Sequence, residues 1–108
     1  MTASTDLLVM LTTAPSAIAG EKLARGLVEA RLAACVNIIP GVLSIYRWKD
    51  DVQADPEVQL VIKTRASLRE RVAQWITENH TYDTPEVIAL PIEGGSQEYL
   101  AWLRRETE

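Results

Sequence analysis

The sequence predicts an α+β fold in the order strand, helix, strand, strand, helix, strand, with one more helix at the C-terminal end. Short apolar runs bounded by turn residues, Leu7–Leu11 and Val87–Leu90, are typical of strands. Two other segments, 16–32 and 67–79, repeat their apolar residues every three to four positions, which is typical of amphipathic helices. Between them lies a long stretch rich in Val, Ile and Tyr, which favours paired strands.

The first strand is Leu7–Leu11, which is apolar at every position and is closed by Thr12, Thr13 and Pro15. Such a run predicts a central strand that is covered on both faces. A helix is expected from Pro15 or Ser16 to about Leu32, with one apolar stripe and one charged row. The stripe contains Ala19, Leu23, Leu27 and Ala30, and the row contains Glu21, Arg25 and Glu29.

Gly26 lies inside this predicted helix, where glycine costs about 1 kcal/mol relative to alanine. We therefore expect the helix backbone to pack closely on the sheet at this point.

The segment 33–62 predicts a long hairpin. Pro40-Gly41 interrupts its first strand, which runs from Ala33 to Trp48, and indicates a bulge or a sharp bend. The second strand is identified by Val58, Leu60 and Ile62, which alternate with polar residues. The polar residues 49–56 are expected to form the tip, projecting into solvent or toward a neighbouring subunit.

Ser67-x-x-Glu70 is a capping-box pattern and predicts the start of the second helix, which ends at about Asn79-His80. A short strand, Val87–Leu90, is then broken by Gly94-Gly95, and Ser96 is expected to cap the last helix. The apolar faces of these helices repeat at helical spacing. They consist of Leu68, Val72, Trp75 and Ile76, and of Tyr99, Leu100, Trp102 and Leu103.

This order of elements is that of a ferredoxin-like βαββαβ fold, with the first and third strands central in an antiparallel sheet. We expect one domain over residues 1–108. The predicted helices cover only one face of the sheet, yet Leu7–Leu11 is apolar on both of its faces. The other face therefore requires a partner surface. A trimer, with three sheets packed around an axis, would supply it, and so would a dimer.

Composition excludes several classes of partner. The net charge of −4 and the pI of about 5.0 disfavour nucleic acid, because a polyphosphate would be repelled. Neither the first residues nor Leu7–Leu11 predict a secretory signal or a membrane span. Cys35 is the only cysteine, so no intrachain disulfide forms, and its apolar context predicts a buried position. We expect a cytoplasmic protein with no organic cofactor.

Several segments, taken together and in order, resemble the CutA divalent-cation tolerance family. They are Arg31–Asn37, Tyr46-x-Trp48, Glu57–Thr64, His80-x-Tyr82-x-Thr84-Pro85-Glu86 and Tyr99-Leu100-x-Trp102. The resemblance runs nearly end to end. It implies a ferredoxin-like domain assembled into a homotrimer like that of the PII signalling proteins, with a link to divalent-metal tolerance and copper binding.

The chain departs from the family pattern at a few positions. Asp50 stands where the family usually has a glycine in the hairpin turn, which predicts a different turn shape or one more left-handed residue. Thr12 and Trp75 stand where some relatives carry additional cysteines, so a cysteine-rich copper site is absent. Thr81 replaces a common proline, which should loosen that turn.

His80 and Cys35 are the candidate ligands for Cu(II) or another divalent cation. His80 is also well placed to cap a helix C-terminus, and Cys35 to act as a small core residue. A metal site needs three or four ligands, so either residue would have to recruit groups such as Asp83 or Glu86, or groups from another subunit.

Lys63, Trp48, Tyr82 and Glu86 are the candidates for binding a small ligand. Lys63 would bind an anion, or would instead form an ion pair with Glu57 or Glu86. Four aromatic residues either line a ligand pocket or cover apolar surface between subunits. They are Tyr46, Trp48, Tyr82 and Trp102.

Two functions follow as hypotheses, because no catalytic constellation or phosphate-binding loop is present and an enzyme is not expected. The first is a trimeric metal-tolerance protein that binds copper or another divalent ion. The alternative is a PII-like trimeric sensor or scaffold that binds a small anion or a protein partner at the subunit cleft. Neither involves nucleic acid or a membrane.

Overall fold

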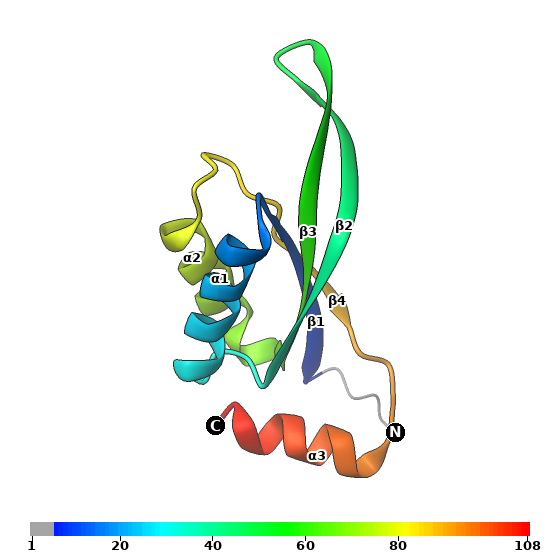
Figure 1. Ribbon diagram of the computed structural model, residues 1–108. Coiled ribbons are helices and arrows are strands. Elements are labelled where there is room, and N and C mark those ends of the chain that lie inside the picture. Colours follow the sequence, from blue (N-terminus) through cyan, green and yellow to red (C-terminus); the bar gives the residue numbers. More distant parts are fainter. Residues whose placement is uncertain (1–5) are drawn as a thin grey trace.

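The computed structural model describes residues 6–108 and contains a four-stranded sheet with three α-helices (Figure 1). Along the chain the elements are β1 (Leu7–Ala14), α1 (Ala17–Glu29), β2 (Cys35–Trp48), β3 (Asp51–Arg65), α2 (Arg69–Asn79), β4 (Ile88–Pro91) and α3 (Gln97–Glu106). A single 3-10 turn, Ala66–Leu68, joins β3 to α2. The predicted α+β fold with a C-terminal helix is confirmed.

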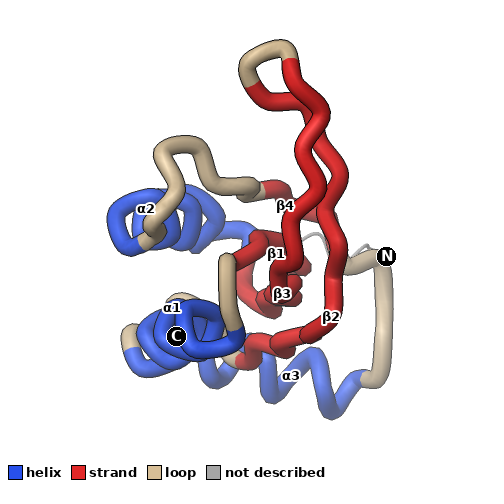
Figure 2. Tube along the Cα trace, turned by 45° about the horizontal axis from the view of Figure 1, so that its top comes forward, coloured by secondary structure: helices blue, strands red, loops and turns tan. Residues whose placement is uncertain are grey.

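The strands lie in the order β2-β3-β1-β4, and every neighbouring pair is antiparallel. The first and third strands of the chain are therefore central, as the ferredoxin-like arrangement predicts. Helices α1 and α2 lie together on one face of the sheet (Figure 2). The core between them and the sheet is aliphatic and includes Met10, Leu27, Leu60, Ile62, Val72 and Ile76, each at most 1% exposed.

Helix α1 begins as predicted but ends three residues early. The Ser16 hydroxyl accepts a hydrogen bond from the Ala19 backbone N–H at 3.1 Å and caps the helix. The last helical residue is Glu29 rather than Leu32, because Arg31 adopts a left-handed backbone with φ of 60° and turns the chain toward β2.

Gly26 is a correction to the sequence analysis, because it packs against helix α2 and not against the sheet. A Cβ atom at Gly26 would lie 2.3 Å from Cζ2 of Trp75. The glycine that meets the sheet is Gly20, whose Cβ would lie 2.9 Å from a methyl group of Val58. The two glycines thus let α1 approach two different neighbours.

The capping box predicted at Ser67 and Glu70 does not form. Ser67 already lies inside the 3-10 turn, and Leu68, the residue before α2, makes no side-chain capping bond. The reason is that β3 runs directly into this turn, whose first N–H, from Ala66, donates to the Asp6 carbonyl at 2.8 Å. Ser67 is therefore not in the extended conformation that a cap requires.

Strands β2 and β3 continue past the rest of the sheet as a two-stranded arm, residues 42–57 (Figure 1). Strand β1 pairs with β3 only from Val58 to Arg65. The expected bulge is present at Pro40-Gly41, since the β2 register shifts between Ile39 and Val42. The polar tip is shorter than expected: β3 already begins at Asp51, and the turn is Lys49-Asp50.

Both turn residues have positive φ, 50° for Lys49 and 69° for Asp50, so the expected left-handed residue at Asp50 is confirmed.

Helix α3 covers one end of the second face of the sheet, where Leu7 packs against Leu100 and Leu103. Ser96 caps this helix as predicted, accepting a hydrogen bond from the Tyr99 N–H at 3.3 Å. Beyond α3 the same face exposes Ile39, Ile88 and Leu90, each close to half of its surface. The arm exposes further large apolar side chains, namely Leu43, Ile45 and Val52.

The contact between Gly26 and Trp75 predicts a coupling between the two helices. In the wild-type background, Gly26→Ala should crowd Trp75, whereas in a Trp75→Ala background the same change should stabilise α1 by about 1 kcal/mol through helix propensity. A double-mutant cycle by urea denaturation should give a coupling of about 1–3 kcal/mol. Gly94→Ala is the control, because no atom lies within 4 Å of its Cβ position. Simple additivity would contradict the prediction.

Candidate functional site

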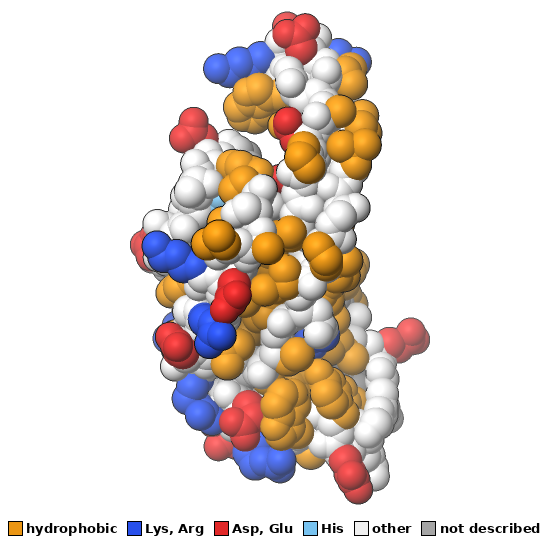
Figure 3. All heavy atoms as spheres, viewed as in Figure 1, with side chains coloured by type: hydrophobic (Ala, Val, Ile, Leu, Met, Phe, Trp, Pro, Cys, Tyr) orange, Lys and Arg blue, Asp and Glu red, His pale blue; other side chains and the backbone are white. Residues whose placement is uncertain are grey.

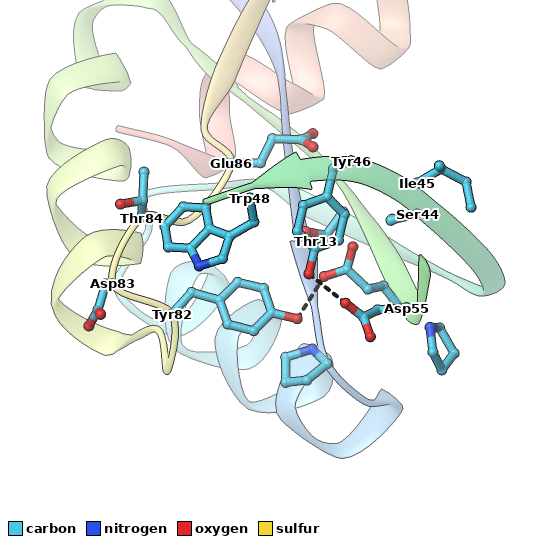
Figure 4. A pocket seen from close by; sticks show the side chains of 13 residues that line it. Thr13, Ser44, Ile45, Tyr46, Trp48, Asp55, Tyr82, Asp83, Thr84 and Glu86 are labelled. Atoms are coloured by element: carbon cyan, nitrogen blue, oxygen red, sulfur yellow. Dashed lines mark hydrogen bonds between the residues drawn. The ribbon is translucent and has the colours of Figure 1, made fainter. Parts of the chain in front are cut away.

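A pocket of about 750 Å³ lies beside the arm, at the point where β1 ends and β3 continues. Three parts of the chain form it: the arm, the end of β1 with the residue that follows it, and the loop that follows α2. The lining residues are Thr13, Pro15, Ser44, Ile45, Tyr46, Trp48, Asp55, Pro56, Glu57, Tyr82, Asp83, Thr84 and Glu86. Figure 4 shows these side chains arranged around the space between the arm and the loop.

The strand alternation of the arm decides which of its side chains share the pocket face. On β2 this face carries Ser44, Tyr46 and Trp48. In the hairpin register Ser44 lies opposite Asp55, and Val42 lies opposite Glu57. Aromatic rings from one strand and carboxylates from the other are thus brought onto one face.

Two tyrosine–carboxylate pairs form the polar part of the pocket (Figure 4). The Tyr82 hydroxyl donates to Glu57 Oε2 at 2.7 Å, and the Tyr46 hydroxyl donates to Asp55 Oδ2 at 2.5 Å. Desolvation, together with the bond to Glu57, raises the pKa of Tyr82 well above its ordinary value. The bond to Asp55 likewise raises the pKa of Tyr46. Both phenols therefore stay neutral donors, and neither cancels the charge of its carboxylate partner.

His80 holds Tyr82 in place. Its Nδ1 accepts a hydrogen bond from the Tyr82 backbone N–H at 3.1 Å, and its Nε2 lies 2.6 Å from the Thr13 carbonyl oxygen. Because a backbone N–H can only donate, the proton of the neutral ring is on Nε2, which donates to Thr13. The two rings are also in contact, tilted by 42° with their centroids 4.5 Å apart. Both nitrogens of His80 are thus committed to the backbone.

Cys35 and Lys63 lie elsewhere, near the other end of the sheet. Cys35 begins β2 and is only half-buried, which corrects the expectation of a buried thiol. Of the two alternatives for Lys63, the ion pair with Glu57 or Glu86 does not form. The Lys63 ammonium group donates to the Asn37 side chain and lies 3.9 Å from the Cys35 sulfur, because Cys35 is its partner in the β2–β3 register.

The structure brings together Trp48, Tyr82 and Glu86 from the predicted ligand-binding set, but not Lys63. Within residues 6–108, no three His, Cys, Asp or Glu side chains are placed to hold a metal ion, and Cys35 is not brought to His80. The sequence places Asp55 and Glu57 in an acidic hairpin, which is typical of a solvated loop or a weak site for hard or borderline cations, and not in the predicted ligand-binding set. The hairpin register is the signal that would have found them, since it sets them on the face that carries Tyr46 and Trp48.

The pocket is acidic. Four of its lining residues carry carboxylates, and no described residue that lines it is Lys or Arg. Figure 4 shows Asp83 and Glu86 at the rim, with their carboxylates directed away from the tyrosine hydroxyls, whereas Asp55 accepts a bond from one of those hydroxyls. An anion would meet only negative charge here, so the geometry favours a cation.

Comparison with known proteins gives a consistent result. Residues 8–106 match the family model described as CutA1 divalent ion tolerance protein. Protein CutA, chloroplastic, of Arabidopsis thaliana is 53% identical over 93% of this chain, which spans only 55% of that relative's length. The Thermus thermophilus divalent-cation tolerance protein CutA is 46% identical, over 92% of this chain and 96% of its own length.

Solved structures agree. CutA1 from Oryza sativa superposes with a TM-score of 0.93 at 47% identity, covering 96% of this chain and 95% of its own. The divalent cation tolerance protein from Thermus thermophilus gives a TM-score of 0.92 at 45% identity. The superposition covers 94% of this chain and 99% of that protein's chain. In the part of the chain that the structure describes, none of the helices is long and apolar enough to cross a membrane.

Tyr82 provides a test of the pocket's hydrogen bonding. Because its folded pKa is raised, the stability that it contributes is fully present below its unfolded pKa of about 10 and is lost as the pH rises further. Tyr82→Phe should therefore lower the free energy of unfolding near neutral pH by about 1 kcal/mol and reduce the loss of stability at alkaline pH. Urea denaturation across the alkaline range measures both. Parallel pH profiles for the two proteins would contradict the assignment.

Proposed function

This chain belongs to the CutA1 divalent ion tolerance protein family, and from that premise we propose that it is a non-enzymatic homotrimer that binds a divalent metal ion. The metal is Cu(II) or another divalent cation, held by groups from more than one subunit. We also propose that residues 1–108 form one domain, which the match over residues 8–106 supports.

The observation that supports the proposed trimer is the apolar surface that one subunit leaves exposed. Ile39, Ile88 and Leu90 lie on the sheet face that α1 and α2 do not cover, and Leu43 is 64% exposed on the arm. Figure 3 shows hydrophobic side chains gathered on the arm and along the body below it. Exposed large apolar side chains in this number are typical of an interface between proteins.

A metal site shared between subunits is consistent with the ligands that one subunit supplies. Cys35 offers a half-buried thiol, a soft donor of the kind that zinc and reduced copper prefer. His80 remains the second proposed ligand, although it would first have to give up a hydrogen bond to the backbone. A three-fold axis would bring copies of one ligand together, which a single subunit cannot do.

The alternative is a PII-like sensor that binds a small anion or a protein partner between subunits. The observation in its favour is Lys63, whose ammonium group lies on the second face of the sheet beside Asn37. A cytoplasmic location is proposed for either function, because the free thiol of Cys35 suits a reducing compartment.

The trimer is tested by multi-angle light scattering after gel filtration. The measured mass of the wild-type protein should be three times its subunit mass of 12.0 kDa. Leu43→Asp and Leu90→Asp should lower that mass, because each places a charge in the apolar interface. Ile18→Asp is the matched control, since Ile18 is 85% exposed on α1, away from both surfaces. A monomeric wild type would overturn the proposal.

Calorimetric titration with Cu(II) and Zn(II) tests metal binding. We expect a Kd below about 100 μM for the trimer and an increase of about tenfold or more, about 1.4 kcal/mol, for Cys35→Ser. Loss of the trimer through Leu90→Asp should also weaken binding if subunits share the site. His80→Ala shows whether the imidazole is a ligand. No saturable binding by the wild-type trimer would count against a direct role in holding metal.

A further inference from the structure

We propose that the pocket beside the arm binds a small organic cation, an alkylammonium ion whose charged group meets Asp55 and Glu57 and whose alkyl chain lies against Trp48. This ligand goes beyond the divalent metals of the proposed function. It depends neither on metal binding nor on Cys35 and His80.

Charge is the first argument. The pocket collects the carboxylates of Asp55, Glu57, Asp83 and Glu86, and none of the described residues lining it is basic. The tyrosine partners of Asp55 and Glu57 are neutral donors, and each bond is made to one carboxylate oxygen, Oδ2 or Oε2. The second oxygen of each carboxylate can accept a bond from an ammonium group, which has up to three N–H donors.

Aromatic rings are the second argument. Tyr46, Trp48 and Tyr82 line the same cavity, and Trp48 is 47% exposed. The face of an aromatic ring attracts a cation within about 6 Å of its centroid. Trp48 already accepts such a contact, because the ammonium group of Lys49 lies 6.0 Å from the centroid of its ring. Trp48 thus offers ring surface beside the carboxylates, against which the alkyl chain of the ligand can lie.

The side chains that line the pocket suit an organic cation better than a metal ion. The faces of the three aromatic rings supply no donor atoms to a metal, whereas they can contact an alkyl chain or an ammonium group. Among the described residues no group of three metal-ligating side chains is assembled here or elsewhere. A volume of about 750 Å³ exceeds what a single ion needs and falls within the range of small-molecule sites.

The experiment follows the indole N–H signals of the three tryptophans by NMR while n-pentylammonium is added. The signal of Trp48, assigned from Trp48→Phe, should shift saturably. Those of Trp75 and Trp102 should not, because neither residue lines the pocket. 1-Pentanol, the neutral analogue of similar size, should bind at least about tenfold more weakly, which corresponds to about 1.4 kcal/mol of charge recognition.

Glu57→Gln and Asp55→Asn should each weaken binding of n-pentylammonium at least threefold, because both remove charge and keep an acceptor for the tyrosine. Glu98→Gln is the matched control, because Glu98 is an exposed carboxylate on α3 outside the pocket, and it should retain wild-type affinity. Equal affinity for n-pentylammonium and 1-pentanol would overturn the proposal. So would an unresponsive Trp48 signal, which would also be the result if a lysine of a neighbouring subunit already filled the pocket.

Discussion

The difference in length between neighbouring strands is the constraint on which the rest of this structure depends. β1 has eight residues and β3 has fifteen, so β3 loses its central partner at Val58 and continues with β2 alone. A two-stranded ribbon is at best marginally stable in water. The arm is therefore anchored at its base, by the bond from Tyr82 to Glu57 and by the contact of His80 with Thr13. The same bonds close one side of the pocket.

The helices cover the sheet unequally, and this determines which surfaces stay exposed. α1 and α2 bury one face of the sheet, and α3 reaches only the Leu7 end of the other. The uncovered part of the sheet exposes Ile39, Ile88 and Leu90 but also carries Asn37 and Lys63. On the arm, an acidic and aromatic face coexists with exposed Leu43 and Ile45. An assembly would bury the apolar parts, whereas carboxylates would resist burial without a counter-charge.

Much of the fold was predictable from the sequence because periodicity reports burial. The order of elements, the central place of β1, the bulge at Pro40-Gly41 and the cap at Ser96 are all confirmed. Long-range packing was not predictable: Gly26 meets Trp75 on a helix far along the chain, and Ser67 loses its capping role to the way β3 enters α2. Of the candidate site, Trp48, Tyr82 and Glu86 were identified, whereas Asp55 required the hairpin register.

The bulge at Pro40-Gly41 determines the pairing of the two faces of the arm. Between Ile39 and Val42 strand β2 advances three residues while β3 advances two, from Gln59 to Glu57. The extra residue inverts the parity of every later side chain on β2. Deleting it would turn Leu43 and Ile45 toward the carboxylates and move the rings to the opposite face. One backbone position, with Gly41 at a φ of 77°, therefore decides which β2 side chains lie on each face of the arm.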